Sequence, residues 1–570
     1  MSAVTTLPRR AHRWVLPGYA LLLTLAVTAP ILAPGYLLLR DAVSTPRSYL
    51  TDAAIGLGES APRAVPQDFA VAVLSAVVDG GVIVKAVLIA GLFLAGWGAA
   101  RLAAQVVPDS GLPGQFVATT VAVWNPYVAE RLLQGHWSLL LAYGCLPWVA
   151  TAVLRLRTGP SRGGDWAAVV FWIALAGLTP TGLLLAGIVG LTCVTVPGSG
   201  IARLRCAAAV LIIAVLAASP WLTASALGTA LGTPQAAGVV PFAARAEPGL
   251  GTLGSLAGLG GIWNAEAVPP GRTTAFALVA TLVLLAIVAC GVPTLARRPA
   301  ARPLLVLAGL SVLLPAAMAT GPGLAVLRAV VDAVPGLAVL RDGQKWVALA
   351  MPGYLLAAAA AVVTLRRWVN PRVTAAVSAV AVIAVLPGLA WGVAGTLRPV
   401  QYPPGWTAVA AAINADPGTV AGLPADTMRR FEWSGPAPVL DPLPRWLRAE
   451  VLSTGDLSVE GRTVPGEGRH ARDVQQLLAA GADPAVLAQA GVAWVVVQYG
   501  TPGAADVPGL EQLSPAYADA DIALYRVGGV SAVAPQSKRI TVIMAHLIWS
   551  GMILGAAAFG VASLRRRAQS

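Results

Sequence analysis

Charged side chains are scarce in this sequence. They make up 11% of its 570 residues, whereas hydrophobic residues make up 57%. Soluble globular proteins carry roughly 25% charged residues, so this chain lacks the polar surface that a soluble protein of its size needs. Its apolar residues fall in long runs, and about 20 apolar residues in a helix span the ~30 Å hydrocarbon core of a bilayer. The composition therefore predicts a membrane protein with several spans.

Cysteine and lysine are also rare. The four cysteines (Cys145, Cys193, Cys206 and Cys290) lie in or beside apolar runs, which is typical of small core residues and predicts no disulfide framework. The chain has three lysines, Lys85, Lys345 and Lys538, against many arginines. Together with the abundance of Ala, Val and Gly, this bias indicates a high-GC bacterial genome, such as that of an actinobacterium.

Sequence motifs of soluble enzymes are missing. No Walker loop is present, which argues against an ATP-driven pump, and neither an HExxH motif nor a Cys/His cluster predicts a metal or a cofactor. The glycine-rich stretch 249–261 fits no dinucleotide-binding fingerprint, so we expect a loop there. No internal repeat supports an inverted-repeat transporter.

The net charge of +13 comes from arginines that gather between the apolar runs. A nucleic-acid-binding surface would instead show a stripe that follows phosphates. Short basic loops beside apolar runs are the positive-inside pattern of membrane proteins. The clusters are Arg9, Arg10 and Arg13; Arg155, Arg157 and Arg162; Arg203 and Arg205; Arg297, Arg298 and Arg302; Arg366, Arg367 and Arg372; and Arg565, Arg566 and Arg567.

Twelve apolar runs predict a polytopic α-helical membrane protein with about 12 transmembrane helices. If the N-terminus is cytoplasmic, every arginine cluster lies inside and the C-terminus returns to the cytoplasm. We expect the first run to be an uncleaved helix, because it is longer than the core of a signal peptide. The segment 166–197 predicts a hairpin of short helices or a re-entrant pair. The runs are 15–39, 81–100, 112–124, 138–154, 166–178, 181–197, 207–226, 273–293, 303–319, 346–365, 373–395 and 540–563.

This topology divides the chain into a transmembrane domain at 1–396, an extracytoplasmic domain at 397–536, and a last helix with a basic cytoplasmic tail at 537–570. The transmembrane domain would carry extracytoplasmic loops at 40–80, 125–137, 227–272 and 320–345. Gln67 to Val78 has apolar residues at helical spacing, which predicts an amphipathic helix in the membrane interface.

Composition changes between residues 397 and 536. Strand-length apolar runs alternate with helical patterns, which predicts a small α/β domain. The expected strands are 419–423, 492–499 and 522–527, and the expected helices are 406–414 and 473–480. His470 in this domain is expected at the surface.

Two acidic residues of the first external loop are candidate catalytic groups. Asp41 directly follows the first apolar run, beside Arg40, and Asp68 opens the amphipathic helix. A carboxylate just outside the hydrocarbon can accept a proton from a sugar hydroxyl while helices exclude water. Asp41 could instead cap the helix end or pair with Arg40, and Asp68 could cap its own helix.

Basic residues of two further loops are candidate phosphate ligands. Arg131 can clamp a phosphate through two parallel hydrogen bonds, or it can simply pair with Glu130. Arg341 and Lys345 lie outside, against the positive-inside trend, and can neutralise a leaving phosphate or pair with Asp342. We expect Arg131, Arg341 and Lys345 to line one external cavity together with Asp41 or Asp68. Weaker candidates are Arg40, His136, Trp137 (otherwise a membrane-belt anchor), Arg245, Glu247, Asn264, Glu266 and Arg272.

The segments WNPYVAERLLQGHW (124–137) and LRDGQKW (340–346) resemble stretches of actinobacterial arabinofuranosyltransferase-type proteins. The layout resembles the GT-C superfamily of membrane glycosyltransferases, which has an acidic residue and interfacial helices in the first external loop. The resemblance implies inverting transfer of arabinofuranose or mannose from a polyprenyl-phosphate sugar to a cell-envelope glycan or glycolipid, without a metal. Asp41 would be the base, and Arg131, Arg341 and Lys345 would hold the donor phosphate.

The first loop departs from that family because it has no adjacent acidic pair. The alternative is a non-catalytic envelope membrane protein that binds a glycolipid or partners a lipid or glycan export machine. Either reading places the chain in the plasma membrane, with membrane lipids and possible envelope-assembly proteins as partners and no nucleic acid.

Overall fold

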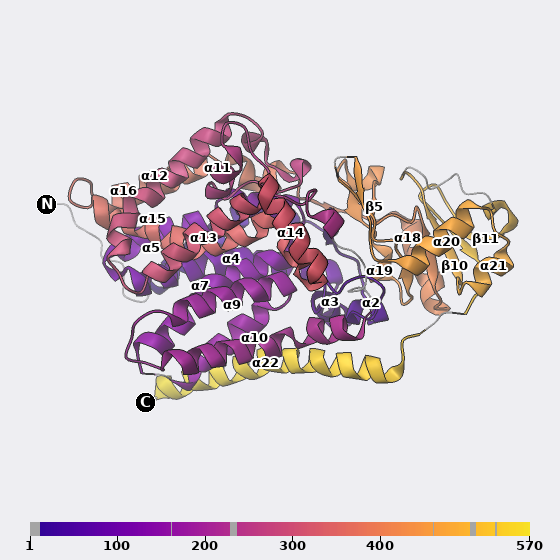
Figure 1. The fold of residues 1–570 in the computed structure, drawn as a ribbon, viewed down its shortest axis with the longest axis horizontal. Coiled ribbons are helices and arrows are strands. Elements are labelled where there is room, and N and C mark those ends of the chain that lie inside the picture. Colours follow the sequence, from indigo (N-terminus) through magenta and orange to yellow (C-terminus); the bar gives the residue numbers. More distant parts are fainter. Residues whose placement is uncertain are drawn as a thin grey trace.

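The computed structural model describes residues 12–160, 162–228, 236–459, 461–501, 509–530 and 533–569. It consists of a helical body and, at one end, a sheet region built from residues 399–526 (Figure 1). The first arginine cluster lies outside the described residues, except for the backbone of Arg13.

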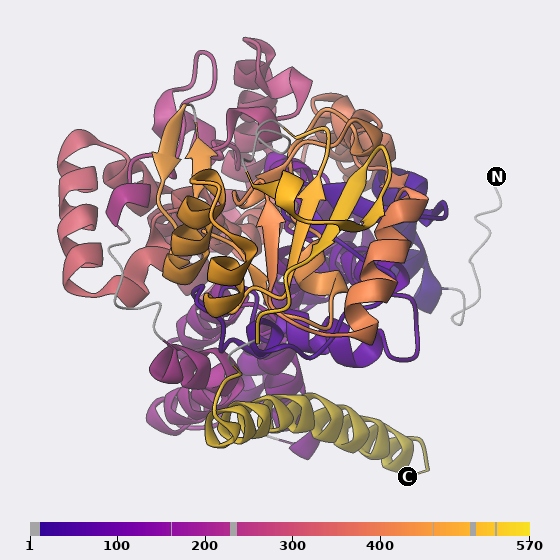
Figure 2. The same ribbon diagram turned by 90° about the vertical axis from the view of Figure 1, so that its right-hand side faces the viewer.

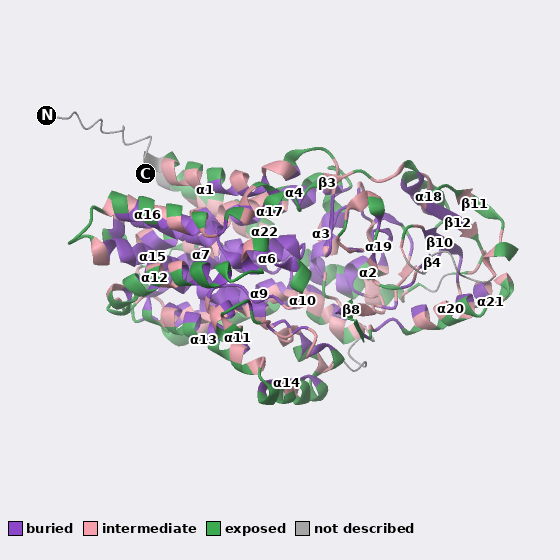
Figure 3. Cartoon of the chain, turned by 90° about the horizontal axis from the view of Figure 1, so that it is seen from above, coloured by how far each residue is buried: buried purple, intermediate pink, exposed green. Residues whose placement is uncertain are grey.

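The helical body is formed by long apolar helices that run between the sheet region and the opposite end (Figures 1 and 2). α7 and α15 are the inner helices, buried along most of their length, whereas α22 lies along one side and is mostly exposed (Figure 3). The helices are α1 (His12–Thr28), α4 (Gly80–Val106), α5 (Gly111–Val123), α7 (Trp137–Thr158), α8 (Gly163–Ala176), α9 (Pro180–Val194), α10 (Arg203–Leu227), α12 (Phe276–Ala296), α13 (Arg302–Met318), α15 (Met351–Leu365), α16 (Pro371–Ala384) and α22 (Gln536–Gln569).

Glycines allow the inner helices to approach closely. A Cβ on Gly144 of α7 would lie 2.2 Å from the carbonyl oxygen of Gly91 on α4, and one on Gly291 of α12 would lie 1.7 Å from that of Ala357 on α15. Lipid supplies no hydrophobic drive for helix association, so membrane helices depend on close packing at small residues. These contacts therefore hold the body together.

Each predicted apolar run forms a helix, but twelve crossings are not confirmed. Among the described residues, seven helices are long and apolar enough to cross a membrane, or up to nine if the two bent pairs α13–α14 and α16–α17 each count as one span. α5 has 13 residues and is therefore only about 20 Å long. The run 15–39 also differs from the prediction, because its last residues form a strand.

α8 and α9 form a short hairpin that starts and ends on one side of the body. The guanidinium of Arg157, at the end of α7, donates to the carbonyls of Val194 (2.9 Å) and Val196 (2.8 Å) and to that of Ile201. The end of α9 and the approach to α10 therefore meet the end of α7. With 14 and 15 residues, these helices fit the predicted hairpin.

The segment after α1 joins the body to the sheet region. β1 (Tyr36–Leu39) pairs with β2 (Ala42–Val43) and with β3 (Pro399–Val400), all antiparallel. Leu38 and Val43 pack into the same core as Trp406 of the sheet region. α2 (Asp52–Ile55) and α3 (Gln67–Leu74) follow, and α3 confirms a helix at the predicted amphipathic segment.

The sheet region contains a five-stranded mixed sheet in the order β11-β12-β10-β4-β7. β10 (Trp494–Gln498) is parallel to β4 (Val420–Leu423) and antiparallel to β12 (Ile522–Arg526), while β7 (Val451–Leu452) and β11 (Pro515–Ala518) form the edges. Alternate residues of β10 point to opposite faces. Val496 packs toward α18 (Pro404–Ala415), and Val495 and Val497 pack toward α20 (Arg469–Ala479) and α21 (Pro484–Gln489).

The structure therefore confirms both predicted helices and the predicted strands at 419–423, 492–499 and 522–527. Most of their ends agree with the prediction to within one or two residues. The remaining elements are α6 (Pro126–Leu133), α11 (Gly251–Ala257), α14 (Gly321–Ala333), the left-handed turn α17 (Ala390–Ala394), α19 (Leu443–Trp446), β5 (Met428–Arg429), β6 (Val439–Leu440), β8 (Leu457–Val459) and β9 (Arg462–Val464). α14 is bent by 92° from α13.

Labelling of single cysteines tests the orientation that the arginine clusters predict. In a variant without the four native cysteines, Ser458→Cys on β8 of the sheet region and Arg367→Cys after α15 of the helical body each provide an exposed thiol. A membrane-impermeant maleimide should label position 458 in intact cells, and position 367 only after permeabilisation. Labelling of position 367 in intact cells would contradict the orientation.

Candidate functional site

Asp41 lies in the turn between β1 and β2, at the end of the helical body that faces the sheet region. The Asp41 backbone N–H donates to the carbonyl of Gln134 (3.1 Å), and the Gln134 side chain donates to Asp41 Oδ2 (3.2 Å). His136 Nε2 lies 2.9 Å from the same oxygen. The side chain of Asp41 is 35% exposed. Asp41 Oδ1 forms no hydrogen bond with another described residue, so one carboxylate oxygen is held and the other is available.

The neighbour on the far side of His136 fixes its tautomer. His136 Nδ1 lies 3.1 Å from Arg131 Nη1, and a guanidinium can only donate. Nδ1 therefore accepts, the ring proton is on Nε2, and Nε2 donates to Asp41. Burial lowers the pKa of His136, and the charges of Lys345 and Arg131 lower it further against the opposing effect of Asp41. His136 is thus a neutral donor that holds the Asp41 carboxylate.

The charge state of Asp41 follows from the same contacts. Burial alone would raise the pKa of this carboxyl group, but the hydrogen bond and charge of His136, the hydrogen bond from Gln134 and the charge of Lys345 bring it below its ordinary value. Asp41 is therefore ionised at neutral pH, as a general base must be.

Arg131 on α6 is fully buried, and both terminal nitrogens of its guanidinium are hydrogen-bonded to other residues of the protein. Nη1 and Nη2 donate to the two carboxylate oxygens of Asp342 at 2.9 and 3.0 Å, and Nη2 also donates to Gln344. Asp342 is buried too; burial alone would raise its pKa, but Arg131 and Lys345 lower it well below its ordinary value. Removing one partner of a buried ion pair typically costs about 3–5 kcal/mol, so this pair is a structural requirement.

Glu130 is not the partner of Arg131 that the sequence offered as an alternative. Its carboxylate accepts from the backbone N–H groups of Gly261 (3.2 Å) and Ile262 (3.1 Å) and from the Gln344 side chain (3.0 Å). Glu130 therefore binds the 259–262 loop to α6. Asn264 extends this network with a 2.8 Å hydrogen bond to Gln134.

Lys345 and Arg341 are the cations of this region that retain unused capacity. Lys345 Nζ lies 3.6 Å from Asp342 Oδ2, and its side chain is 26% exposed. Arg341 stacks over the Phe242 ring at 4.4 Å and forms no hydrogen bond or close ion pair with another described residue. Burial and the charge of Arg63 lower the pKa of Arg341 to about 10, so it stays charged at neutral pH.

We call Asp41, His136, Arg131, Asp342, Lys345 and Arg341 the polar cluster. It brings together side chains from three stretches of the chain, and its three cations face only two carboxylates because His136 is neutral. The surplus positive charge beside an available carboxylate oxygen is suited to an anionic ligand.

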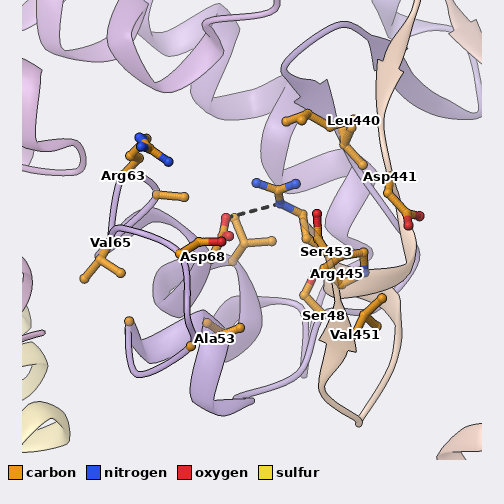
Figure 4. A pocket seen from close by; sticks show the side chains of 18 of the residues that line it. Ser48, Ala53, Arg63, Val65, Asp68, Leu440, Asp441, Arg445, Val451 and Ser453 are labelled. Carbon is orange, nitrogen blue, oxygen red and sulfur yellow. Dashed lines mark hydrogen bonds and ion pairs between the residues drawn. The ribbon is translucent and has the colours of Figure 1, made fainter. Parts of the chain in front are cut away.

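A separate cavity of about 280 Å³, the junction cavity, lies between the 43–71 segment and the sheet region. Asp68 faces Arg445 of α19 there, with Asp68 Oδ1 3.2 Å from Arg445 Nε (Figure 4). Trp137 and Glu450 also line it, whereas Asp41 and the three cations of the polar cluster do not. The prediction that Asp68 shares one cavity with these cations is therefore wrong, because Asp68 is paired on the far side of the first loop.

The weaker candidates have structural partners. Arg40, which the sequence offered as an alternative partner of Asp41, donates to the carbonyls of Leu133 (2.7 Å) and Glu266 (2.8 Å). Arg245 donates to the carbonyl of Ile262 (3.2 Å), and Glu247 forms a buried ion pair with Arg272. Trp137 is buried, which does not fit a membrane-belt anchor.

Sequence reasoning missed the importance of Asp342, Gln344 and Glu450. The sequence suggests Asp342 only as a partner of Arg341 and Lys345. No local pattern connects it to Arg131, 211 residues earlier. Comparison of the chain with protein-family models, with curated proteins and with solved structures finds no match.

The junction cavity gives the sheet region a pH-sensitive group. Burial, and then the charges of Asp52 and Glu59, raise the pKa of Glu450 from 4.5 to about 7. The folded chain therefore binds more protons than the unfolded chain between these values, and the free energy of unfolding falls as pH rises through this window. Arg63 and Arg445, which also line the cavity, do not outweigh this effect.

We expect Glu450→Gln, which stays neutral, to reduce the loss of stability between about pH 5 and about pH 8. Thermal unfolding of the purified protein at both values measures it. Glu432→Gln, at an exposed position, is the matched control and should behave as the unmodified protein. An equal loss in both variants would contradict the assignment to Glu450.

Proposed function

We propose that this chain is a membrane glycosyltransferase that works at the extracytoplasmic face. In this proposal it transfers a sugar, arabinofuranose or mannose, from a polyprenyl-phosphate donor to an envelope glycan or glycolipid. The observation that carries the proposal is the polar cluster: an ionised carboxylate with one available oxygen that lies within reach of the charge of Lys345, a cation with unused capacity. The resemblance of 124–137 and 340–346 to arabinofuranosyltransferase-type segments supports it, because both segments contribute to this cluster.

Asp41 is the proposed general base. An acceptor hydroxyl gives its proton to Asp41 Oδ1 while its oxygen attacks the anomeric carbon of the donor. The bond between that carbon and the phosphate oxygen breaks, and the electron pair leaves with the phosphate. Attack opposite the leaving group inverts the anomeric centre. His136 and Gln134 hold Oδ2 throughout, which keeps the carboxylate in one orientation.

Lys345 and Arg341 are the proposed ligands of the donor phosphate. Negative charge grows on the phosphate as the bond breaks, and fixed cations stabilise that charge. Arg131 was expected to bind the phosphate, but Asp342, Gln344 and His136 already occupy its terminal nitrogens. Its proposed role is to position His136 and the 342–345 segment.

We expect Asp41→Asn to lower the rate of sugar transfer by ~10²–10⁴-fold, the usual contribution of a general base. The assay follows a labelled polyprenyl-phosphate sugar in membranes that contain equal amounts of each variant. Asp68→Asn, measured at saturating acceptor, is the matched control and should retain the rate of transfer, because Asp68 lies in the junction cavity and not beside Asp41. Loss of transfer only in Asp68→Asn would make Asp68 the base. Full transfer in both variants would favour the non-catalytic glycolipid-binding protein.

Lys345→Gln and Arg341→Gln should each weaken donor binding. A hydrogen bond to a charged group contributes about 1.5–3 kcal/mol, so we expect the KM for the donor to rise by roughly tenfold or more. Arg328→Gln, on the exposed face of α14, removes the same charge elsewhere on the molecule and should leave the KM unchanged. An unchanged KM in both test variants would exclude this phosphate site.

A further inference from the structure

The junction cavity has walls from two parts of the chain that are distant in sequence. One wall is the segment from Val43 to Val71, and the other is the segment from Thr427 to Ser453 of the sheet region. Its volume of about 280 Å³ is at the lower end of the range for small-molecule sites, roughly 300–1,000 Å³. A ligand of one or two small rings fits this volume.

Most charged groups in the wall are paired, one pair within the wall itself and two with residues behind it. Asp68 is paired with Arg445, Asp441 with Arg429 (2.9 Å), and Arg63 with Glu467. The pair of Asp68 and Arg445 offers a donor and an acceptor side by side in fixed positions. Two neighbouring hydroxyl groups of a sugar match this pattern, because each hydroxyl both donates and accepts.

The rest of the wall supplies the other two features that a sugar ring needs. Ser48 and Ser453 add hydroxyl groups. Val65, Val71 and the indole of Trp137 form an apolar surface, against which the C–H face of a ring can pack. Figure 4 shows Asp68 and Arg445 facing each other across the cavity, with Ser48 and Ser453 beside Arg445.

Two other ligand classes fit less well. Four carboxylates, Glu59, Asp68, Asp441 and Glu450, line the cavity against the guanidinium groups of Arg63 and Arg445, so an anion would be repelled. Asp68 and Asp441 are each paired with an arginine, which weakens the attraction of a cation.

We propose that the junction cavity binds a neutral carbohydrate segment, one or two sugar rings long, between the first external loop and the sheet region. The role of this carbohydrate rests on the proposed function, because in a glycosyltransferase the bound segment is the acceptor. The binding itself does not require transfer, so the two can be tested separately.

Saturation-transfer NMR on the full chain in nanodiscs, without donor, tests the binding. The probes are neutral arabinose and mannose trisaccharides at millimolar concentration, with trigalacturonate as an acidic probe and a chitosan trisaccharide as a cationic probe. Ser453→Trp fills the cavity, and Ser458→Trp places the same side chain on an exposed strand position. Asp68→Asn keeps the shape of the wall and removes one acceptor charge.

We expect a neutral trisaccharide to bind the unmodified protein, Ser458→Trp and Asp41→Asn alike. Binding should be at least tenfold weaker in Ser453→Trp and clearly weaker in Asp68→Asn. The Asp68→Asn variant keeps the test valid if Ser453→Trp does not fold. Three results would each overturn the proposal. They are no binding of the neutral probes, tighter binding of the acidic or the cationic probe, and binding by Ser453→Trp and Asp68→Asn as tight as by the unmodified protein.

The same variants separate this inference from the proposed function. Transfer that persists in a folded Ser453→Trp variant would show that the cavity is not the acceptor site, while the glycosyltransferase proposal would stand. Carbohydrate binding together with full transfer by Asp41→Asn would keep the binding site and remove the proposed base.

Discussion

The buried ion pair between Arg131 and Asp342 is the contact on which the polar cluster depends. It joins α6 to the segment before α15, and the same guanidinium accounts for the tautomer of His136, which in turn holds Asp41. Two charges out of water are tolerated only when hydrogen bonds support both, and Gln344 and His136 add hydrogen bonds to the terminal nitrogens of Arg131. Without this pair, His136 would lose the partner that sets its tautomer, and Lys345 would lose the carboxylate beside it.

The segment that follows α1 connects the two parts of the molecule. β1 pairs with β3 at the start of the sheet region, while the turn after β1 carries Asp41 and hydrogen-bonds to Gln134 of the helical body. Arg40 reinforces this junction through the carbonyls of Leu133 and Glu266. The polar cluster and the junction cavity therefore lie on either side of one hairpin, and a displacement of the sheet region would move both.

The two sites differ in their charge. The polar cluster has more cations than carboxylates, whereas the junction cavity has more carboxylates than guanidinium groups. Most of the charged groups that line the cavity, taken together, are paired. An anionic head group and a neutral polyol would therefore be drawn to different places. Trp137 and His136 are neighbours in sequence, yet one lines the cavity and the other belongs to the cluster, so α7 begins where the two sites meet.

The sequence alone determined the helices of the body and the central strands of the sheet, because the apolar periods and runs of those segments are local properties. It also placed Asp41, His136, Arg131 and Lys345 among the candidates. It could not determine that Asp342 would form the ion pair with Arg131, that Asp68 would pair with Arg445, or that the end of the first apolar run would form β1. Those outcomes arise from contacts between residues hundreds of positions apart, and only the tertiary structure decides which buried charge meets which partner.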